Sequence, residues 1–320
     1  MHITIIGAGA MGSLLAFYLC EEADVWLLDR WRAQVETIAR DGLRCERDGV
    51  ETLRRPHATA DPTAIGPCDV ALVLVKAHQT DWAAEQARLL SSDDRPLVIT
   101  LQNGLGNRER LAAALGAGRV GQAVTSLGAT LLGPGRVRHA GQGATVFAAE
   151  PGGALVAELA ALFARAGLPA EVADDLDSLV WGKLVVNAGI NALTALLRVP
   201  NGALADVPEA QALLARAAAE AAAVAAARGT ALPYDDPVAH TLAVARATGA
   251  NRSSMLQDVL RGSPTEIGAI NGAVAAEGRR LGVPTPLNDL LAELVAALDA
   301  AALWRRDDGR TTNDERRLCS

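Results

Sequence analysis

The sequence is short of aromatic residues, cysteines and positive charge, and each shortage excludes a class of protein. Aromatic side chains make up 3% of 320 residues although half of the residues are hydrophobic. We therefore expect a core of alanine, leucine and valine, which suits helix–helix packing. The net charge of −7, with no basic stripe, argues against a nucleic-acid partner. The cysteines lack the spacing of a zinc site or a disulfide framework; they are Cys20, Cys45, Cys68 and Cys319.

We expect neither a signal peptide nor a membrane span. The first β-branched run starts at residue 2 or 3, which leaves no room for a signal peptide. The alanine-rich run from Ala210 to Ala227 is interrupted by Arg216 and Glu220, so it predicts a helix of a soluble protein. Together with reduced cysteines, these features predict a cytoplasmic protein with no membrane partner.

A glycine motif at the N-terminus organises the rest of the chain. Residues 3–6 predict a buried parallel strand, and an apolar helix starts at Ser13. Between them, Gly7 allows a tight bend, Gly9 lets the backbone approach a pyrophosphate, and Gly12 lets the helix pack on the strand. The helix N-terminus attracts phosphate, so we expect a dinucleotide. The alternative is a glycine-rich turn of another α/β protein. The G-x-G-x-x-G match is Gly7, Ala8, Gly9, Ala10, Met11 and Gly12.

The chain in order predicts two domains. Residues 1–172 alternate apolar strands with helices, which is typical of a Rossmann-type α/β dinucleotide-binding domain. Within it, Leu43–Thr59 predicts a small strand pair, and Val120–Ala149 predicts strands that close the far edge of the sheet. Residues 173–306 predict an all-α domain, and residues 307–320 a frayed tail.

Polar residues follow two of the predicted strands. Lys76 comes at the end of the apolar run Asp69–Val75, and Asn103 follows the run Leu97–Leu101. Because ligands of open α/β sheets bind at the carboxyl ends of the strands, we expect Lys76 and Asn103 beside the cofactor.

The segment WGKLVVNAGINALTAL places Lys183, Asn187 and Asn191 four residues apart. Steps of four drift only about 40° around a helix, so the three side chains share one side of an otherwise apolar helix. They must find partners or line a polar cavity, and burial would lower the pKa of the lysine toward that of a useful proton donor. The alternative is a lysine that extends to solvent beside two capping-type asparagines.

A second polar cluster contains Asn251, Ser253 and Ser254, and it is followed by Ser263, Thr265 and Glu266. The order Ser-Pro-Thr-Glu fits a capping box with proline at the first helical position. The spacing alone therefore favours Glu266 as the cap of a helix from Thr265 to Leu281, although it does not separate a cap from a catalytic group.

These segments resemble the ketopantoate reductases (2-dehydropantoate 2-reductases). The resemblance covers His2 to Leu298 and implies a Rossmann domain followed by a helical domain like that of 6-phosphogluconate dehydrogenase, with the active site in the cleft between them. The motifs that carry it, in order, are GAGAMG, VKAHQT, LQNGLG, WGKLVVNAGINALTAL, NRSSMLQDV and TEIGAING.

The resemblance also implies roles for individual positions. Lys183 looks like the general acid that protonates the keto oxygen as hydride arrives from a nicotinamide, and Glu266 looks like the residue that binds the substrate hydroxyl. This reverses the interpretation from spacing, with capping still compatible. Lys76 and Asn103 resemble residues beside the nicotinamide and its ribose. The positions that resemble substrate-binding residues are Asn187, Asn191, Asn251 and Ser254.

Two neighbouring residues give opposite indications about the cofactor. Family members commonly use NADPH and an arginine at the end of the second strand, a position that Arg30 matches. Asp29 stands directly before it, about 20 residues after the glycines, where a carboxylate binds ribose hydroxyls and repels a 2′-phosphate. We therefore expect an NAD(P)H enzyme with dual use or a bias toward NADH.

Three functions follow as hypotheses. The first is reduction of ketopantoate in pantothenate biosynthesis, and the second is an NAD-dependent D-2-hydroxy-acid dehydrogenase for another branched or aromatic acid. The third is a non-catalytic nucleotide sensor, which would need no proton donor such as Lys183. A small 2-oxo acid is the expected partner, no metal is required, and the helical domain could form a homodimer. The sequence leaves open which 2-oxo acid is used.

Overall fold

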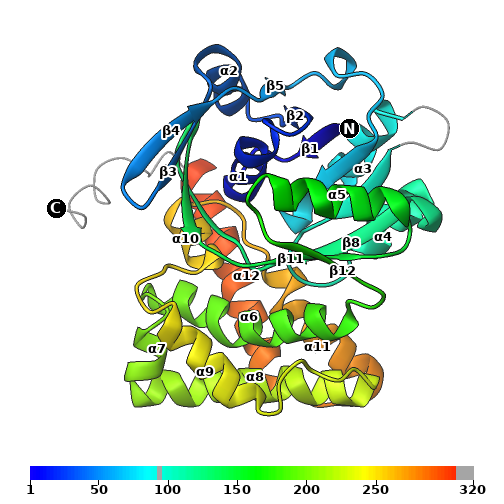
Figure 1. Cartoon of the computed structure of the whole chain (residues 1–320). Helices are drawn as coiled ribbons and strands as arrows, with labels where there is room; N and C mark the ends of the chain where they lie inside the picture. Colours follow the sequence, from blue (N-terminus) through cyan, green and yellow to red (C-terminus); the bar gives the residue numbers. More distant parts are fainter. Residues whose placement is uncertain (92–95, 308–320) are drawn as a thin grey trace. The chain divides into compact units, whose positions relative to one another are not determined.

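The chain is described here from a computed structural model, over residues 1–91 and 96–307. It divides into a sheet unit (1–102 and 106–176) and a helical unit, which begins at Asp177 and also takes in Asn103–Leu105. Figure 1 follows the chain from the N-terminal strand of the sheet unit in blue to the last helix of the helical unit in red.

The predicted tail, residues 307–320, lies outside the described residues from 308 onward, and so does the segment 92–95.

The sheet unit is built on one eight-stranded sheet in the order β12-β11-β8-β7-β6-β1-β2-β5. Six neighbouring strands of this sheet are parallel, namely β8, β7, β6, β1, β2 and β5. Strand β11 runs antiparallel to β8. In chain order this is the doubly wound arrangement, with its switch point between β1 and β6. The predicted Rossmann-type fold is therefore confirmed. The strands are β1 (His2–Ile6), β2 (Asp24–Leu28), β5 (His57–Thr59), β6 (Val70–Val73), β7 (Leu97–Thr100), β8 (Val120–Thr125), β11 (Thr145–Ala148) and β12 (Ala170–Ala173).

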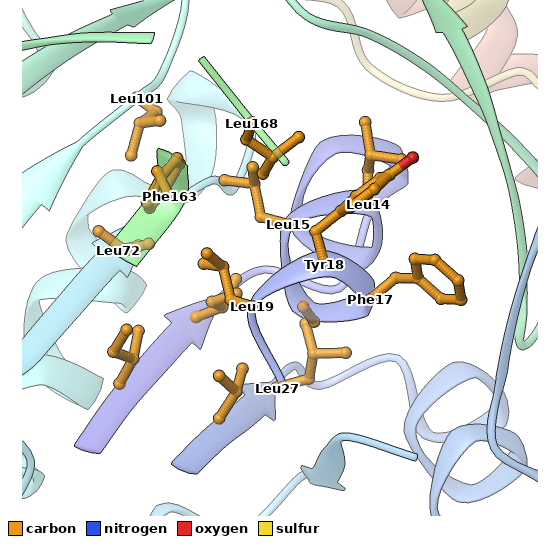
Figure 2. Close-up of a cluster of buried hydrophobic side chains, with 14 of the residues drawn as sticks. Leu14, Leu15, Phe17, Tyr18, Leu19, Leu27, Leu72, Leu101, Phe163 and Leu168 are labelled. Carbon is orange, nitrogen blue, oxygen red and sulfur yellow. The ribbon is translucent and has the colours of Figure 1, made fainter. Parts of the chain in front are cut away.

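Helix α1 carries the main core of this unit. Figure 2 shows Leu15 and Leu19 of α1 turned toward Leu72 and Phe163, and all four side chains are buried. The helix is apolar almost all round because it is covered on several sides. The helices of the unit are α1 (Ala10–Leu19), α2 (Arg32–Asp41), α3 (Thr80–Leu89), α4 (Asn107–Leu115) and α5 (Ala154–Arg165), with 3₁₀ turns η1 (Pro62–Ala64), η2 (Ala77–Gln79) and η3 (Ala117–Arg119).

The predicted edge strands are placed differently from expectation. Only β8 and β11 of the run Val120–Ala149 join the main sheet. The other two strands pair with the predicted small strand pair in a separate sheet of order β4-β3-β10-β9, which contacts α1. Alternation along single strands does not reveal their pairing partner, which explains the error. These strands are β3 (Leu43–Arg47), β4 (Val50–Arg54), β9 (Gly128–Gly133) and β10 (Arg136–Gly141).

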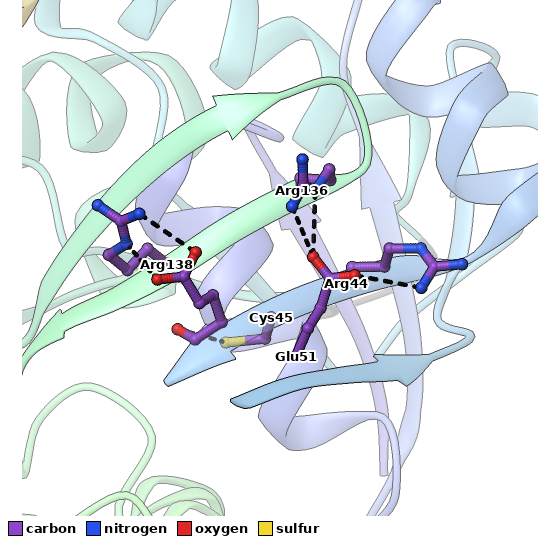
Figure 3. Close-up of polar contacts among 6 residues, drawn as sticks. Arg44, Cys45, Glu51, Arg136 and Arg138 are labelled. Atoms are coloured by element: carbon purple, nitrogen blue, oxygen red, sulfur yellow. Dashed lines mark hydrogen bonds and ion pairs between the residues drawn. The ribbon is translucent and has the colours of Figure 1, made fainter. Parts of the chain in front are cut away.

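Charged side chains link three strands of the smaller sheet, as Figure 3 shows. The carboxylate of Glu51 accepts hydrogen bonds from Arg44 at 3.2 Å and Arg136 at 2.8 Å. Arg138 on β10 pairs with Glu46 on β3 at 2.8 Å. Because these pairs are solvent-accessible, they contribute little to stability and mainly favour this strand register.

The helical unit packs around α6. Its core is formed by small and aliphatic side chains, among them Ala188, Leu214, Ala218 and Val274. Gly189 of α6 allows the close approach of a neighbouring helix, because a Cβ there would lie 2.9 Å from a methyl group of Thr241 on α9. The all-α prediction is confirmed. The helices are α6 (Asp177–Leu197), α7 (Ala203–Asp206), α8 (Pro208–Arg228), α9 (Pro237–Ala247), α10 (Ser254–Leu260), α11 (Asn271–Leu281) and α12 (Pro286–Asp307), with a 3₁₀ turn η4 (Ile267–Ala269).

Two of these helices, α6 and α8, have the length and hydropathy of a membrane span. Both pack within the core of the helical unit, where α6 is the more deeply buried. The Glu220 carboxylate of α8 accepts hydrogen bonds from the backbone N–H groups of Leu287 and Asn288 at 3.0 and 2.9 Å. Glu220 thus caps the first turn of α12, which is a structural role typical of a core helix.

Candidate active site

The glycine loop has the backbone shape that its motif predicts. Gly7 has a φ of +117°, and a Cβ there would lie 2.7 Å from the backbone nitrogen of Val75. A Cβ on Gly12 would collide with the carbonyl oxygen of Gly7. Gly9 occupies the N-cap position of α1 but has no side chain that could cap the helix, and the space where a Cβ would lie is open. The loop therefore offers the first turn of α1 to a phosphate, and its partly exposed residues Ala10 and Met11 belong to that turn.

Asp29 lies at the end of β2, where it contacts the glycine loop. One carboxylate oxygen accepts the Ala8 N–H at 2.7 Å, and the other accepts the Trp31 N–H at 2.9 Å. Arg30 is exposed, and its guanidinium carbon lies 5.5 Å from the centroid of the Trp82 ring. The structure thus places both residues with opposite charges at this end of the sheet.

The loop after β6 is fixed by a side chain from the end of β7. The Gln102 amide donates to the carbonyl oxygen of Val75 and to the Thr80 hydroxyl, both at 3.0 Å. Lys76 follows Val75 and precedes η2. Lys76 and Lys183 are the only two lysines in the sequence, which otherwise takes its positive charge from arginine.

Lys183, Asn187 and Asn191 share α6, as the spacing predicts. Lys183 and Asn187 are partly exposed, and Asn191 is 6% exposed. The ammonium end of Lys183 is desolvated, which lowers its pKa to about 8, and the Glu266 carboxylate opposes this shift. A lysine with such a pKa carries a proton at neutral pH and can release it more readily than an ordinary lysine.

Glu266 does not cap a helix, so the interpretation from spacing is wrong. Its side chain is 6% exposed and makes no capping hydrogen bond to η4, and the long helix predicted from Thr265 begins only at Asn271. The cap-like role goes to Thr265, whose hydroxyl accepts the Ile267 N–H at 3.3 Å and donates to Asp299 at 2.8 Å. The Glu266 carboxylate raises the pKa of the Lys183 ammonium.

Asn103 belongs to the same helical unit as Glu266, which the sequence did not predict. The backbone N–H of Leu105 donates to the carbonyl oxygen of Ala269 at 2.9 Å. Gly104 is required here, since its φ is +83° and a Cβ would collide with the same carbonyl group. The segment that carries Asn103 is thus held on the turn that follows Glu266.

A pair of hydroxyl groups fixes the start of α10 on α6. Thr194 and Ser253 are hydrogen-bonded at 2.7 Å, and Ser253 also accepts the Leu256 N–H at 3.0 Å as the N-cap of α10. Ser254 is the first residue of that helix and is partly exposed. Ser253 was expected in a polar cluster but without a role, although a serine before a helix is a recognisable capping signal, and Thr194 was not predicted.

Asn251 is exposed, and its backbone is held from the turn that precedes α7. The Asn201 N–H donates to the Asn251 carbonyl oxygen at 3.0 Å, and the Asn201 amide donates to Thr248 at 2.9 Å. Asn201 was not predicted from the sequence. Nothing in its local pattern indicates this contact, because the two loops lie 50 positions apart.

We expect Ser253→Ala to destabilise the protein by about 1–3 kcal/mol. The substitution removes an N-cap and leaves the buried Thr194 hydroxyl with one partner fewer. Urea unfolding measures this effect. Ser263→Ala, a partly exposed serine beyond the end of α10, is the control. Unchanged stability in Ser253→Ala would contradict a role of the Thr194–Ser253 hydrogen bond in holding α10 on α6.

Comparison with known families covers almost all of the chain. The family described as ketopantoate reductase PanE/ApbA matches residues 3–152, and its C-terminal domain matches residues 175–299. The chain is 38% identical to a 2-dehydropantoate 2-reductase from Halobacterium salinarum, over 92% of this chain and 98% of that protein.

Solved structures agree with this match. A PanE/ApbA family ketopantoate reductase from Ralstonia eutropha JMP134 is 34% identical, with a TM-score of 0.86 over 95% of this chain and all of that one. D-mandelate dehydrogenase with NADH and anilino(oxo)acetate is 28% identical, with a TM-score of 0.85 over 94% and 99%. The chain therefore belongs to the ketopantoate reductase family, whose members are NAD(P)H-dependent oxidoreductases acting on CH–OH and C=O groups.

Proposed function

We propose that the protein reduces the keto group of ketopantoate (2-dehydropantoate) to give pantoate, with NAD(P)H as the cofactor. The observation that carries this proposal is the Lys183 ammonium, whose pKa is lowered to about 8 on a helix face shared with Asn187 and Asn191. The Glu266 carboxylate acts on the same ammonium group. A 2-oxo acid needs such a proton donor together with polar groups that bind its carboxylate and hydroxyl.

Each residue has a distinct task in this proposal. Lys183 donates its proton to the keto oxygen, which becomes the hydroxyl group of the product, and the amine is reprotonated from solvent. Glu266 accepts a hydrogen bond from the substrate hydroxyl and keeps the pKa of Lys183 from falling further. Ser254 binds the substrate carboxylate, and three amides line the pocket around the substrate. These amides are Asn187, Asn191 and Asn251.

The glycine loop fits a dinucleotide. The open space beside Gly9 and the uncapped first turn of α1 suit a pyrophosphate. A bound reduced nicotinamide supplies the hydride that reaches the keto carbon. Lys76 and Asn103 are the residues that we place beside the nicotinamide and its ribose.

Asp29 and Arg30 together favour use of both cofactors, with a bias toward NADH. The carboxylate is held against the glycine loop through the Ala8 N–H at 2.7 Å, and from there it would bind the adenosine ribose of a dinucleotide. A 2′-phosphate would meet this negative charge, although Arg30 is exposed and able to bind the phosphate.

A second candidate function is an NAD-dependent D-2-hydroxy-acid dehydrogenase for another branched or aromatic acid. Its support is the likeness to D-mandelate dehydrogenase with NADH, together with the carboxylate of Asp29. The same proton donor and carboxylate-binding groups serve either acid, because the two substrates differ only in the side chain.

Oxidation of NADH and of NADPH, measured with ketopantoate and a panel of branched and aromatic 2-oxo acids, tests the proposal. We expect the highest kcat/KM for ketopantoate, and kcat/KM with NADPH less than about 100-fold above that with NADH. Preference for an aromatic acid would favour the second function. Tight cofactor binding without turnover of any acid would instead indicate a nucleotide sensor.

The cellular setting is part of the same proposal. We place the enzyme in the cytoplasm and in pantothenate biosynthesis, with a small 2-oxo acid as its partner, no nucleic acid and no membrane. A homodimer through the helical unit is compatible with this function.

A further inference from the structure

Gln34 of α2 is a buried amide in direct contact with the glycine loop. Its side chain is fully buried, and its nitrogen donates to the carbonyl oxygen of Ala8 and to the Ser13 hydroxyl, both at 3.0 Å. Its oxygen accepts the backbone N–H of Gly135 at 2.8 Å. Ser13 in turn donates to the same Ala8 carbonyl oxygen at 3.1 Å. These contacts use both hydrogens of the amide and one lone pair of its oxygen.

The orientation of this amide is determined by its neighbours. The Gly135 N–H requires an acceptor, and the Ala8 carbonyl group requires a donor, so the oxygen and nitrogen of Gln34 cannot exchange places. A glutamate carboxylate at position 34 would accept the Gly135 N–H but would have no hydrogen to donate to the Ala8 carbonyl oxygen. Position 34 thus selects for an amide by its hydrogen bonds as well as by its volume.

Gln34 and Asp29 hold the two polar groups of one residue. Asp29 accepts the Ala8 N–H at 2.7 Å, and Gln34 donates to the Ala8 carbonyl oxygen. Ala8 is thereby fixed from both sides at the bend of the loop. The next residue, Gly9, begins the open turn of α1, so the orientation of that turn depends on how Ala8 is held.

We propose that Gln34 is a positioning residue for the dinucleotide: it fixes the Ala8 peptide so that the first turn of α1 is preorganised for the pyrophosphate. This inference rests on the proposed NAD(P)H-dependent function. Preorganisation matters because a loop that must be ordered on binding loses affinity by the cost of that ordering.

The same amide connects the cofactor loop to the smaller sheet. Gly135 lies in the turn between β9 and β10, has a φ of +69°, and its carbonyl oxygen accepts the Arg44 N–H at 2.8 Å. The turn also packs on α2, since a Cβ on Gly135 would lie 2.8 Å from a methyl group of Thr37. The β9–β10 turn therefore supports the glycine loop through Gln34.

Calorimetric titration with NADH and with NADPH tests the inference. We expect Gln34→Ala to raise Kd for both cofactors by about 10–100-fold, because the loop is then no longer preorganised and must be ordered on binding. KM for the 2-oxo acid at saturating cofactor, and the pH at which the reduction rate falls, should not change. A stability loss without a change in Kd would show that Gln34 is merely structural and would overturn the inference.

Two further variants keep the test decisive. Thr37→Ala removes a contact to the same turn without touching the loop, and we expect its Kd to stay within about threefold of the wild type.

If Gln34→Ala fails to fold, Gln34→Glu replaces it. We expect weak binding at pH 8 that recovers relative to the wild type near pH 6, where a protonated carboxyl group can donate to Ala8. Equal weakening in Thr37→Ala, or wild-type affinity in Gln34→Glu at pH 8, would overturn the inference. A wild-type protein that binds neither cofactor would instead refute the proposed function.

Discussion

Lys183→Ala is expected to lower kcat for reduction of the 2-oxo acid by about 10²–10⁴ and to leave Kd for NAD(P)H within about threefold. The ammonium group is the proton donor in the proposed reaction, and the cofactor loop belongs to the sheet unit, whereas Lys183 is on α6. Stopped-flow measurement of cofactor oxidation gives the rate, and calorimetry gives the affinity. A matching loss of cofactor affinity would mean that the lysine is structural.

The pH dependence of the wild-type enzyme gives an independent test of the same residue. Because the pKa of Lys183 is about 8, the amine is mostly protonated below that pH. Reduction needs the protonated amine, so kcat/KM for reduction should be constant at lower pH and fall about tenfold per pH unit above pH 8. Oxidation of the hydroxy acid needs the neutral amine, so its rate should rise through the same range.

Lys183→Arg separates charge from proton donation. The guanidinium group keeps the positive charge but does not release a proton near neutral pH, since its pKa exceeds about 12. We expect kcat to remain at least about 100-fold below the wild type. Activity close to that of the wild type would show that Lys183 acts only by its charge.

Glu266→Gln is expected to lower kcat/KM for ketopantoate by about 10–150-fold, because a hydrogen bond to a charged group is worth about 1.5–3 kcal/mol. Glu266 also raises the pKa of Lys183, so loss of its charge lowers that pKa below about 8. The pH at which the reduction rate falls should therefore move downward. Steady-state kinetics from pH 6 to 9 measure both effects.

A substrate without the hydroxyl group provides the control for Glu266. With 3,3-dimethyl-2-oxobutanoate, which lacks only that hydroxyl, Glu266→Gln loses no hydrogen bond to the substrate. The remaining effect on the rate should then come through Lys183 alone and should be smaller at pH 6 than at pH 8. An equal loss for both substrates at pH 6 would contradict a role of Glu266 in binding the hydroxyl group.

The glycine loop and the helix that carries Lys183 could be predicted because their determinants are local. Gly7, Gly9 and Gly12 are defined by steric demands within a few residues, and the shared face of Lys183 and Asn191 follows from helical periodicity alone. The sequence motifs were equally sufficient to identify the family, which the comparison confirmed.

Glu266 shows where local reasoning fails. Its spacing from Ser263 matches a capping box, but the chain turns through η4 before α11 begins, and Thr265 is tied to Asp299 on α12. The competing contact comes from a residue 34 positions away. A pattern of four residues holds no information about such a partner.

The amino-acid sequence by itself determined the order of strands and helices, the dinucleotide loop and the polar face of α6, because each depends on neighbours within one or two turns. Tertiary structure alone decided that β9 and β10 leave the main sheet, that Gln34 holds Ala8, and that Glu266 acts on Lys183. The physical reason is that strand pairing, buried hydrogen bonds and electrostatic pKa shifts depend on distances between residues that are far apart in the chain.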